Sequence, residues 1–177
     1  RTEIQRAWTQ MTLSADEAQE FLSRYSAELA GHHIARLDNL LWEGEETRAR
    51  EMLPRVPADW RALAEARMAL RARRDGVDGL IEAIPSSLSN DAGLAYERFV
   101  WRMRAGFWDS ARDLMAARSG SAESLGRPER WADRRATLVR DVMREGGYAE
   151  AYRLATPHHM TADDDASDFA ELEWLAG

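Results

Sequence analysis

The residues of this 177-residue chain that are best suited to chemistry are two adjacent histidine pairs and one acidic run. They are His32-His33, His158-His159 and Asp163-Asp164-Asp165. Neighbouring side chains on a helix point about 100° apart, so neither pair can chelate a metal ion as an i, i+4 pair would. The acidic run precedes an expected helix, whose dipole it favours, and it lacks the spacing of a calcium loop. We therefore predict no metal site, with a site built from the second pair and the acidic run as the alternative.

Composition and motif content exclude most other catalytic chemistry. The chain has no cysteine, which removes disulfides, thiolate metal sites and cysteine nucleophiles. All 24 Lys+Arg residues are arginine, so there is no Schiff-base lysine and no Walker A loop. No serine stands in a Gly-x-Ser-x-Gly elbow, and the only Glu-Ser dipeptide, Glu123-Ser124, lies in a Ser/Gly-rich segment that we interpret as a loop. The sequence predicts no catalytic, metal-binding or cofactor-binding residue, and no cofactor.

Net charge and hydropathy reduce the classes of binding partner that we expect. A net charge of -7 and a pI of about 5.2 disfavour nucleic acid, whose binding needs a basic footprint. No stretch approaches the roughly 20 apolar residues that a transmembrane helix needs. The sequence begins at Arg1 without a start methionine or a signal peptide, and we expect it to be a segment of a longer protein.

Tryptophan and arginine are the two residue types whose role the sequence leaves open. Tryptophan rings stack on sugar faces, but most of them lie on apolar helix sides, so core packing is favoured over a carbohydrate platform. The seven are Trp8, Trp42, Trp60, Trp101, Trp108, Trp131 and Trp174. Two arginine clusters are interpreted as solvated faces paired with acids, with carboxylate binding as the alternative. They are Arg71-Ala72-Arg73-Arg74 and the group Arg98, Arg102, Arg104.

The elements that must position these residues are all expected to be helices, because strand patterns are absent and helix formers fill the segments between turns. Ser14 and Glu17 form a capping box that begins a helix through about Leu29. Further helices are predicted at 33–43, 45–53, 58–74, 77–83, 92–105, 107–118, 128–145, 148–156 and 165–175. The segments 86–91 and 119–126 are expected to be inter-helix loops.

One sub-pattern recurs at the helix-to-helix corners. An apolar residue stands three positions before a glycine, and an alanine stands five positions after it. The copies are Leu41-Trp42-Glu43-Gly44 with Ala49, Met103-Arg104-Ala105-Gly106 with Ala111, and Met143-Arg144-Glu145-Gly146 with Ala151, and Gly76 with Ile81 is a weaker copy. The glycine permits a left-handed helix end, and the alanine allows a close approach of the next helix. The pattern favours a solenoid of about five helix pairs.

Several stretches resemble the superhelical part of soluble lytic murein transglycosylases. The main ones are residues 91–111, DAGLAYERFVWRMRAGFWDSA, and 143–155, MREGGYAEAYRLA, with shorter likenesses at 36–44, 60–67, 127–131 and 168–177. The resemblance covers most of the chain from about residue 30. It implies an all-α, right-handed, tetratricopeptide-like superhelix that forms a single domain over 1–177 and is a fragment of a longer enzyme.

The resemblance also implies a periplasmic enzyme that cleaves the glycosidic bond between N-acetylmuramic acid and N-acetylglucosamine and leaves a 1,6-anhydro ring. That family's Glu-Ser followed by Gly-Leu-Met-Gln is absent here, so no catalytic residue is carried over and this chain alone is not expected to be active. The implied partners are peptidoglycan glycan strands and the enzyme's own catalytic module, with the chain as a monomer. The alternatives are a helical-repeat protein-interaction module unrelated to the cell wall, and a small self-contained all-α enzyme using His158, His159 and the nearby Asp residues.

Overall fold

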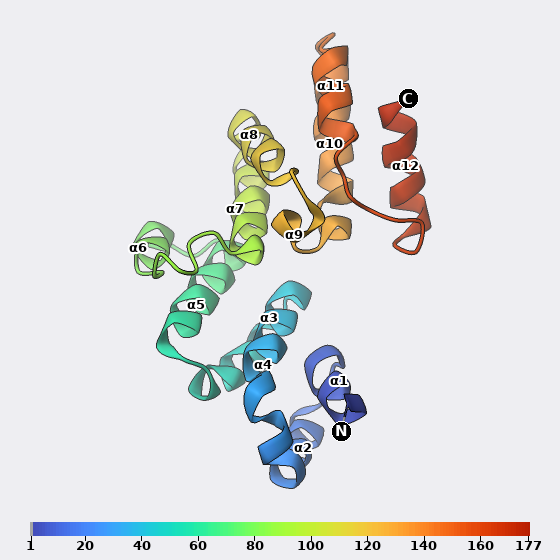
Figure 1. Cartoon of the computed structure of the whole chain (residues 1–177). Helices are drawn as coiled ribbons and strands as arrows, with labels where there is room; N and C mark the ends of the chain where they lie inside the picture. Colours follow the sequence, from blue (N-terminus) through green and yellow to red (C-terminus); the bar gives the residue numbers. More distant parts are fainter. Residues whose placement is uncertain (1) are drawn as a thin grey trace. The chain divides into compact units, whose positions relative to one another are not determined.

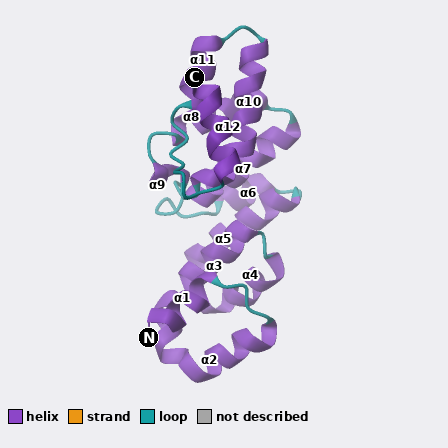
Figure 2. Cartoon of the chain, turned by 90° about the vertical axis from the view of Figure 1, so that its right-hand side faces the viewer, coloured by secondary structure: helices purple, strands orange, loops and turns teal. Residues whose placement is uncertain are grey.

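The computed structural model describes residues 2–177, in which all regular elements are helices (Figures 1 and 2). The all-α prediction is confirmed for these residues, which contain no strand. The α-helices are α1 (Thr2–Gln10), α2 (Ala15–Leu29), α3 (His33–Glu43), α4 (Glu46–Met52), α5 (Ala58–Ala72), α6 (Val77–Glu82), α7 (Ala92–Ala105), α8 (Trp108–Arg118), α9 (Ala122–Leu125), α10 (Ala132–Arg144), α11 (Tyr148–Ala155) and α12 (Ala166–Ala176). Short 3-10 helices cover Ala30–His32, Leu53–Arg55 and Pro128–Trp131. Within the described range, no helix combines the length and apolar character needed to cross a bilayer.

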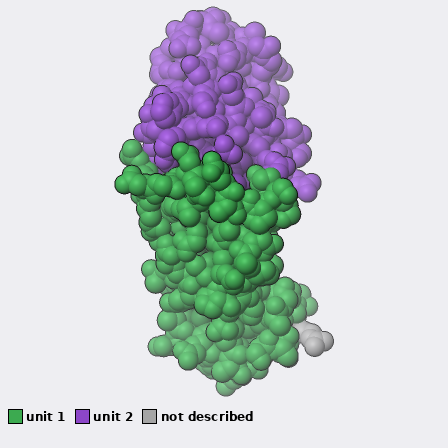
Figure 3. Space-filling view, turned by 90° about the vertical axis from the view of Figure 1, so that its left-hand side faces the viewer, with its two compact units in different colours: residues 1–89 green, residues 90–177 purple. Residues whose placement is uncertain are grey.

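The chain divides into two compact units, Arg1–Ser89 and Asn90–Gly177 (Figure 3). The division falls inside the segment 86–91, which the sequence indicated as an inter-helix loop. The expectation of a single domain over 1–177 stays a prediction.

Unit 1 is built of successive helix pairs that contact one another through their first helices. The pairs α1 with α2, α3 with α4 and α5 with α6 are in contact, and α3 also packs against both α1 and α5. Trp8, Leu37 and Ala49 are fully buried in its core. Buried side chains of helices α1 to α5 therefore share one hydrophobic core.

Unit 2 has its core around Trp131. The indole stacks on Phe99 with ring centroids 4.7 Å apart and meets Tyr96 edge-on at 5.5 Å. Its ring N–H donates to the Leu125 carbonyl at 3.1 Å, so the buried polar atom has a partner. In this unit α7 packs on α8 and α9, α10 on α8 and α11, and α12 on both α10 and α11.

The predicted corners have the expected geometry. Gly44, Gly106 and Gly146 have φ of 78°, 82° and 83°, in the left-handed region that a side chain would strain. In each corner the residue after the glycine donates its N–H to a carbonyl five positions back, which closes the helix end in a Schellman-type arrangement. The three alanines Ala49, Ala111 and Ala151 are 0%, 0% and 2% exposed, as close helix packing requires.

A fourth corner has the same left-handed backbone conformation, but the residue that adopts it is not a glycine. Arg73 ends α5 with φ of 55°, its N–H donates to the Leu70 carbonyl at 3.2 Å, and Arg74 donates to the Ala69 carbonyl at 3.0 Å. The sequence pattern placed this break at Gly76, which instead precedes α6 at φ 77°. The helix predicted over 58–74 therefore ends at Ala72.

Three elements differ from the sequence predictions. Helix α1 was not predicted, because its sequence carries no strong local helix signal. Its one buried residue is Trp8, which is covered by helices that follow later in the chain. The short α9 lies inside the expected loop 119–126, where the Ser121 hydroxyl accepts the Ser124 N–H at 3.1 Å. The helix predicted over 128–145 has a 3-10 turn from Pro128, and its α-helical part begins only at Ala132.

Candidate functional site

The second histidine pair, His158-His159, bonds to α12 and to the residue that follows the C-terminal end of α8. His158 is 5% exposed, its Nδ1 accepts the Met160 N–H at 3.1 Å, and its Nε2 donates to Glu173 of α12 at 2.9 Å. His159 has φ of 55° and its Nε2 donates to the Ser119 carbonyl at 2.8 Å. The two rings therefore bond to different elements and do not converge.

Two carboxylates of the acidic run accept backbone N–H groups, one at a turn and one at the start of a helix. Asp165 is the N-cap of α12 and accepts from the backbone of Ser167 and Asp168 at 2.9 and 3.1 Å. Asp164 accepts from the Thr161 backbone and hydroxyl. Burial, together with the charges of Asp165, Glu171 and Asp133, raises the pKa of Asp168. No group of three or more potential metal ligands gathers anywhere in residues 2–177.

The first histidine pair lies at the start of α3. His33 meets Trp8 edge-on, with ring centroids 5.8 Å apart. Its Nδ1 is buried without a hydrogen-bond partner among the described residues. Burial lowers the pKa of His33, and the nearby charges of Arg55, His32 and Arg36 lower it further. His33 therefore belongs to a positively charged region of unit 1.

Glu123-Ser124 lies on α9 and lines a small cavity in unit 2. The cavity holds about 280 Å³ and is also lined by Asn90, Ala92, Arg118 and Ser121. The Arg118 guanidinium is saturated by the protein itself, because it donates to the Ser124 carbonyl at 2.9 Å and to the Asn90 side chain and carbonyl at 2.5 and 3.2 Å. Glu123 is exposed, and apart from Ala92 the residues that line this cavity are polar or charged.

The interpretation of the arginine clusters as solvated faces is only partly right. Arg74 pairs with Glu46 as expected, but Arg71 reaches the Trp42 carbonyl at 3.4 Å and Arg102 the Ser110 carbonyl at 3.0 Å. The buried arginines all lie outside the two predicted clusters. Arg36 donates to the Trp8 carbonyl at 2.6 Å, and Arg135 to the Leu154 carbonyl and the Ser119 hydroxyl at 2.6 and 2.7 Å. Such guanidiniums satisfy carbonyls that a helix end leaves unpaired.

The tryptophans separate into core and surface. Trp8 and Trp131 are fully buried and Trp42 is 4% exposed, so these three are core residues as predicted. Trp174 on α12 is 73% exposed, which core packing does not explain. Trp60, Trp101 and Trp108 are half-buried.

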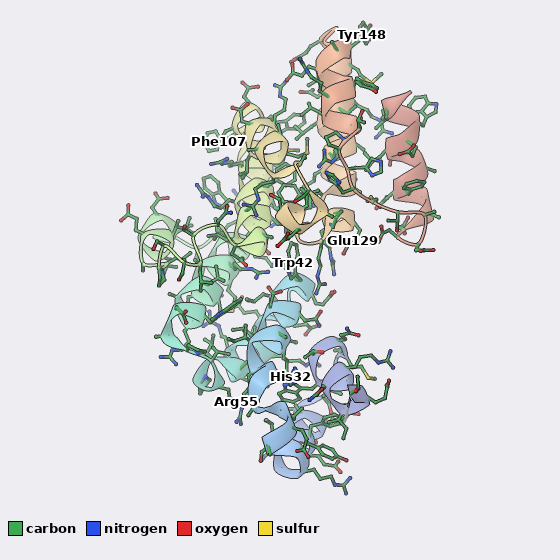
Figure 4. All side chains as sticks on the ribbon, in the orientation of Figure 1. His32, Trp42, Arg55, Phe107, Glu129 and Tyr148 are labelled. Carbon is green, nitrogen blue, oxygen red and sulfur yellow. The ribbon has the colours of Figure 1, made fainter. Side chains whose placement is uncertain are left out.

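Three exposed aromatic side chains lie on two helices of unit 2 that pack against each other. Tyr148 and Tyr152 are 69% and 56% exposed, and because they are four residues apart they share one side of α11. Figure 4 shows Tyr148 at the beginning of that helix. Together with Trp174 of the neighbouring α12 they form what we call the α11/α12 aromatic group. Large exposed rings of this kind are typical of binding surfaces, where they can stack on a planar or sugar partner.

The comparisons with family models, with curated proteins and with solved structures gave no match. The described residues of this chain offer helix pairs in contact, exposed aromatic rings and buried arginines.

Proposed function

We propose that this chain is a scaffold segment of a periplasmic peptidoglycan lytic transglycosylase. In this proposal the helix pairs are turns of a right-handed, tetratricopeptide-like superhelix. The superhelix contacts glycan strands, and the cleavage is performed by a catalytic module that this sequence does not contain. The bond cleaved would join N-acetylmuramic acid to N-acetylglucosamine.

The repeated corner is the observation that carries the scaffold part. Three corners combine a left-handed glycine, the same pair of closing hydrogen bonds and a buried alanine in the following helix. Recurrence of one corner gives successive helix pairs the same local geometry, which is how solenoids are built. The stretches that resemble the transglycosylase superhelix, 91–111 and 143–155, contain two of these three corners.

The α11/α12 aromatic group supports glycan contact. Aromatic rings bind pyranose faces by stacking, and exposed rings of 56% to 73% have surface to offer. Co-sedimentation of the chain with purified peptidoglycan sacculi tests this. We expect binding by the wild type, and a variant with Tyr148→Ala, Tyr152→Ala and Trp174→Ala should lose affinity by at least about tenfold.

Phe107→Ala is the matched control for this experiment. Phe107 is 55% exposed in the same unit, but it lies at the α7/α8 corner and stacks on Trp101 at 5.8 Å. We expect this variant to bind sacculi like wild type. Equal binding by the triple variant, or no binding by the wild type, would contradict glycan contact through this group.

Reading the gene beyond the codon for Gly177 tests the family part of the proposal. We expect a downstream segment that encodes Glu-Ser followed by Gly-Leu-Met-Gln. A reading frame without that segment, together with failure to bind sacculi, would favour the protein-interaction module instead.

A further inference from the structure

Unit 1 contains a cavity of about 570 Å³ whose walls carry an unusual set of charges. It is lined by Trp8 of α1, by one side of α2, by Arg36 of α3, by Arg48, Glu51 and Met52 of α4, and by Arg55. Three arginines and one glutamate line it in a chain whose net charge is -7. The volume lies within the range of small-molecule sites, roughly 300–1,000 Å³.

Arg36 forms the buried end of this cavity. Its guanidinium lies over the Trp8 ring, 4.1 Å from the centroid, and Nη1 donates to the Trp8 carbonyl at 2.6 Å. This is its only hydrogen bond among the described residues, although a guanidinium has five N–H donors. Arg36 is 3% exposed and lines the cavity, and its other N–H groups have no acceptor among the described residues.

The other charges are close enough to affect Arg36, and two of the three have no partner among the described residues. Burial lowers the pKa of Arg36, the nearby Arg48 lowers it further, and Glu51 raises it. Arg48 is held by Glu45 at 2.6 Å. Arg55 and Glu51 are exposed, and neither makes an ion pair or hydrogen bond within residues 2–177. Figure 4 labels Arg55 and His32 in this unit.

We propose that this cavity binds a short acidic peptide with a free amino terminus. The guanidiniums of Arg36 and Arg55 would receive its carboxylates, since arginine matches planar oxyanions. Glu51 would receive its ammonium group and would repel a simple polyanion such as phosphate. The apolar side chains of Leu22 and Met52 would cover the aliphatic part of the ligand.

The dipeptide Gly-Glu, with two carboxylates and one ammonium, is the probe that tests this inference. Isothermal titration calorimetry on the whole chain should show saturable binding. Gly-Gln, which lacks one carboxylate, and N-acetyl-Gly-Glu, which lacks the ammonium, should each bind about tenfold or more weakly. Amide chemical shifts should move at residues of α2 and α4 and not in unit 2.

Three variants assign the charges without touching the core. Arg55→Gln should weaken Gly-Glu about tenfold, and Glu51→Gln should bind Gly-Glu and N-acetyl-Gly-Glu equally well. Arg24→Gln is the matched control, because Arg24 is an exposed arginine of α2 outside the cavity and pairs only with Glu20 at 3.3 Å. The control should bind like wild type.

The inference is overturned by any of three results. These are no Gly-Glu binding at millimolar concentration, equal binding of Gly-Glu and inorganic phosphate, or wild-type affinity in Arg55→Gln. The result does not depend on the sacculi experiment, because the two assays use different ligands and different units of the chain.

Discussion

Each unit of this protein has a cavity lined by a buried arginine, and the two arginines are used differently. In unit 2 Arg118 makes three hydrogen bonds, to Asn90 twice and to Ser124. In unit 1 Arg36 makes one, to the Trp8 carbonyl, within the described residues. The first guanidinium joins α9 to the segment before α7, whereas the second keeps donors that the described residues do not use. A buried charge with satisfied donors is structural, and one with unsatisfied donors is the better candidate for a ligand.

The comparison predicts that removing Arg118 has the larger effect on stability. Arg118→Met would leave the Asn90 side chain and two backbone carbonyls without their donor, and should cost about 2–4 kcal/mol. Arg36→Met loses one such bond and also removes a poorly compensated buried charge, so it should cost about 1–2 kcal/mol. Urea unfolding followed by circular dichroism, with hydrogen exchange to localise the change, measures both.

The effects of the same two substitutions on Gly-Glu binding should have the opposite order. Arg36→Met should abolish Gly-Glu binding, while Arg118→Met, measured where it remains folded, should bind Gly-Glu like wild type because Arg118 lies in unit 2. Equal stability losses in the two variants would break the comparison. An unchanged Gly-Glu affinity in a folded Arg36→Met variant would break it as well.

The corners, in contrast, have the same backbone geometry in both units. Substitution of their buried alanines tests whether they are also close-packed in the same way. Ala49 of unit 1 and Ala111 and Ala151 of unit 2 are all buried at the start of a second helix. Replacing any one with leucine adds volume to a closed junction and should cost about 1–3 kcal/mol. Under the proposed solenoid arrangement, hydrogen exchange should rise mainly in the altered pair and its neighbour, because each repeat of a solenoid contacts only adjacent ones.

Ala117→Leu is the control for the alanine series. Ala117 is an exposed alanine on α8, the same helix as Ala111, and helix propensity barely changes from alanine to leucine. The variant should therefore unfold like wild type. If the Ala111→Leu and Ala117→Leu variants unfold at the same urea concentration, the corners are not close-packed junctions.

The fold was predictable from sequence where the signal is local. The capping box of Ser14 and Glu17 and the glycines at 44, 106 and 146 specify a helix end within two or three residues of themselves, and those ends are where they were predicted. Helix α1 was missed because its stability depends on distant packing around Trp8. Helix α9 was missed because a four-residue helix has no periodicity to detect.

The buried arginines could not be predicted because their acceptors are distant in sequence. Arg36 and Arg118 bond to residues 28 positions away, and Arg135 reaches 19 positions forward to Leu154. A charged side chain by itself is expected at the surface, and only the placement of an unpaired helix-end carbonyl draws it inside. The absence of lysine from a chain with 24 Lys+Arg residues is the one available hint, since arginine tolerates burial better than lysine.

The smallest predicted effect concerns the one corner of unit 1 that departs from the glycine pattern. Arg73 adopts φ of 55°, close to the angles of Gly44 and Gly106, but as a non-glycine residue it is strained there by about 1 kcal/mol. Arg73→Gly removes that strain and loses part of the gain to the greater freedom of glycine in the unfolded chain. The arginine is exposed, so little packing is lost. We expect a net stabilisation of about 0.5 kcal/mol.

Gly106→Ala at the matching corner of unit 2 is the reverse change, and its sign should also be reversed. A Cβ at Gly106 would meet no atom within 4 Å, so the cost arises from backbone strain at φ 82° and not from a clash. We expect a destabilisation of about 1 kcal/mol, partly offset by the reduced freedom of alanine in the unfolded chain. Measured together, the two variants isolate the left-handed conformation as the shared requirement of the corners. If Arg73→Gly is destabilising while Gly106→Ala is neutral, then side-chain contacts set these helix ends and the left-handed conformation does not.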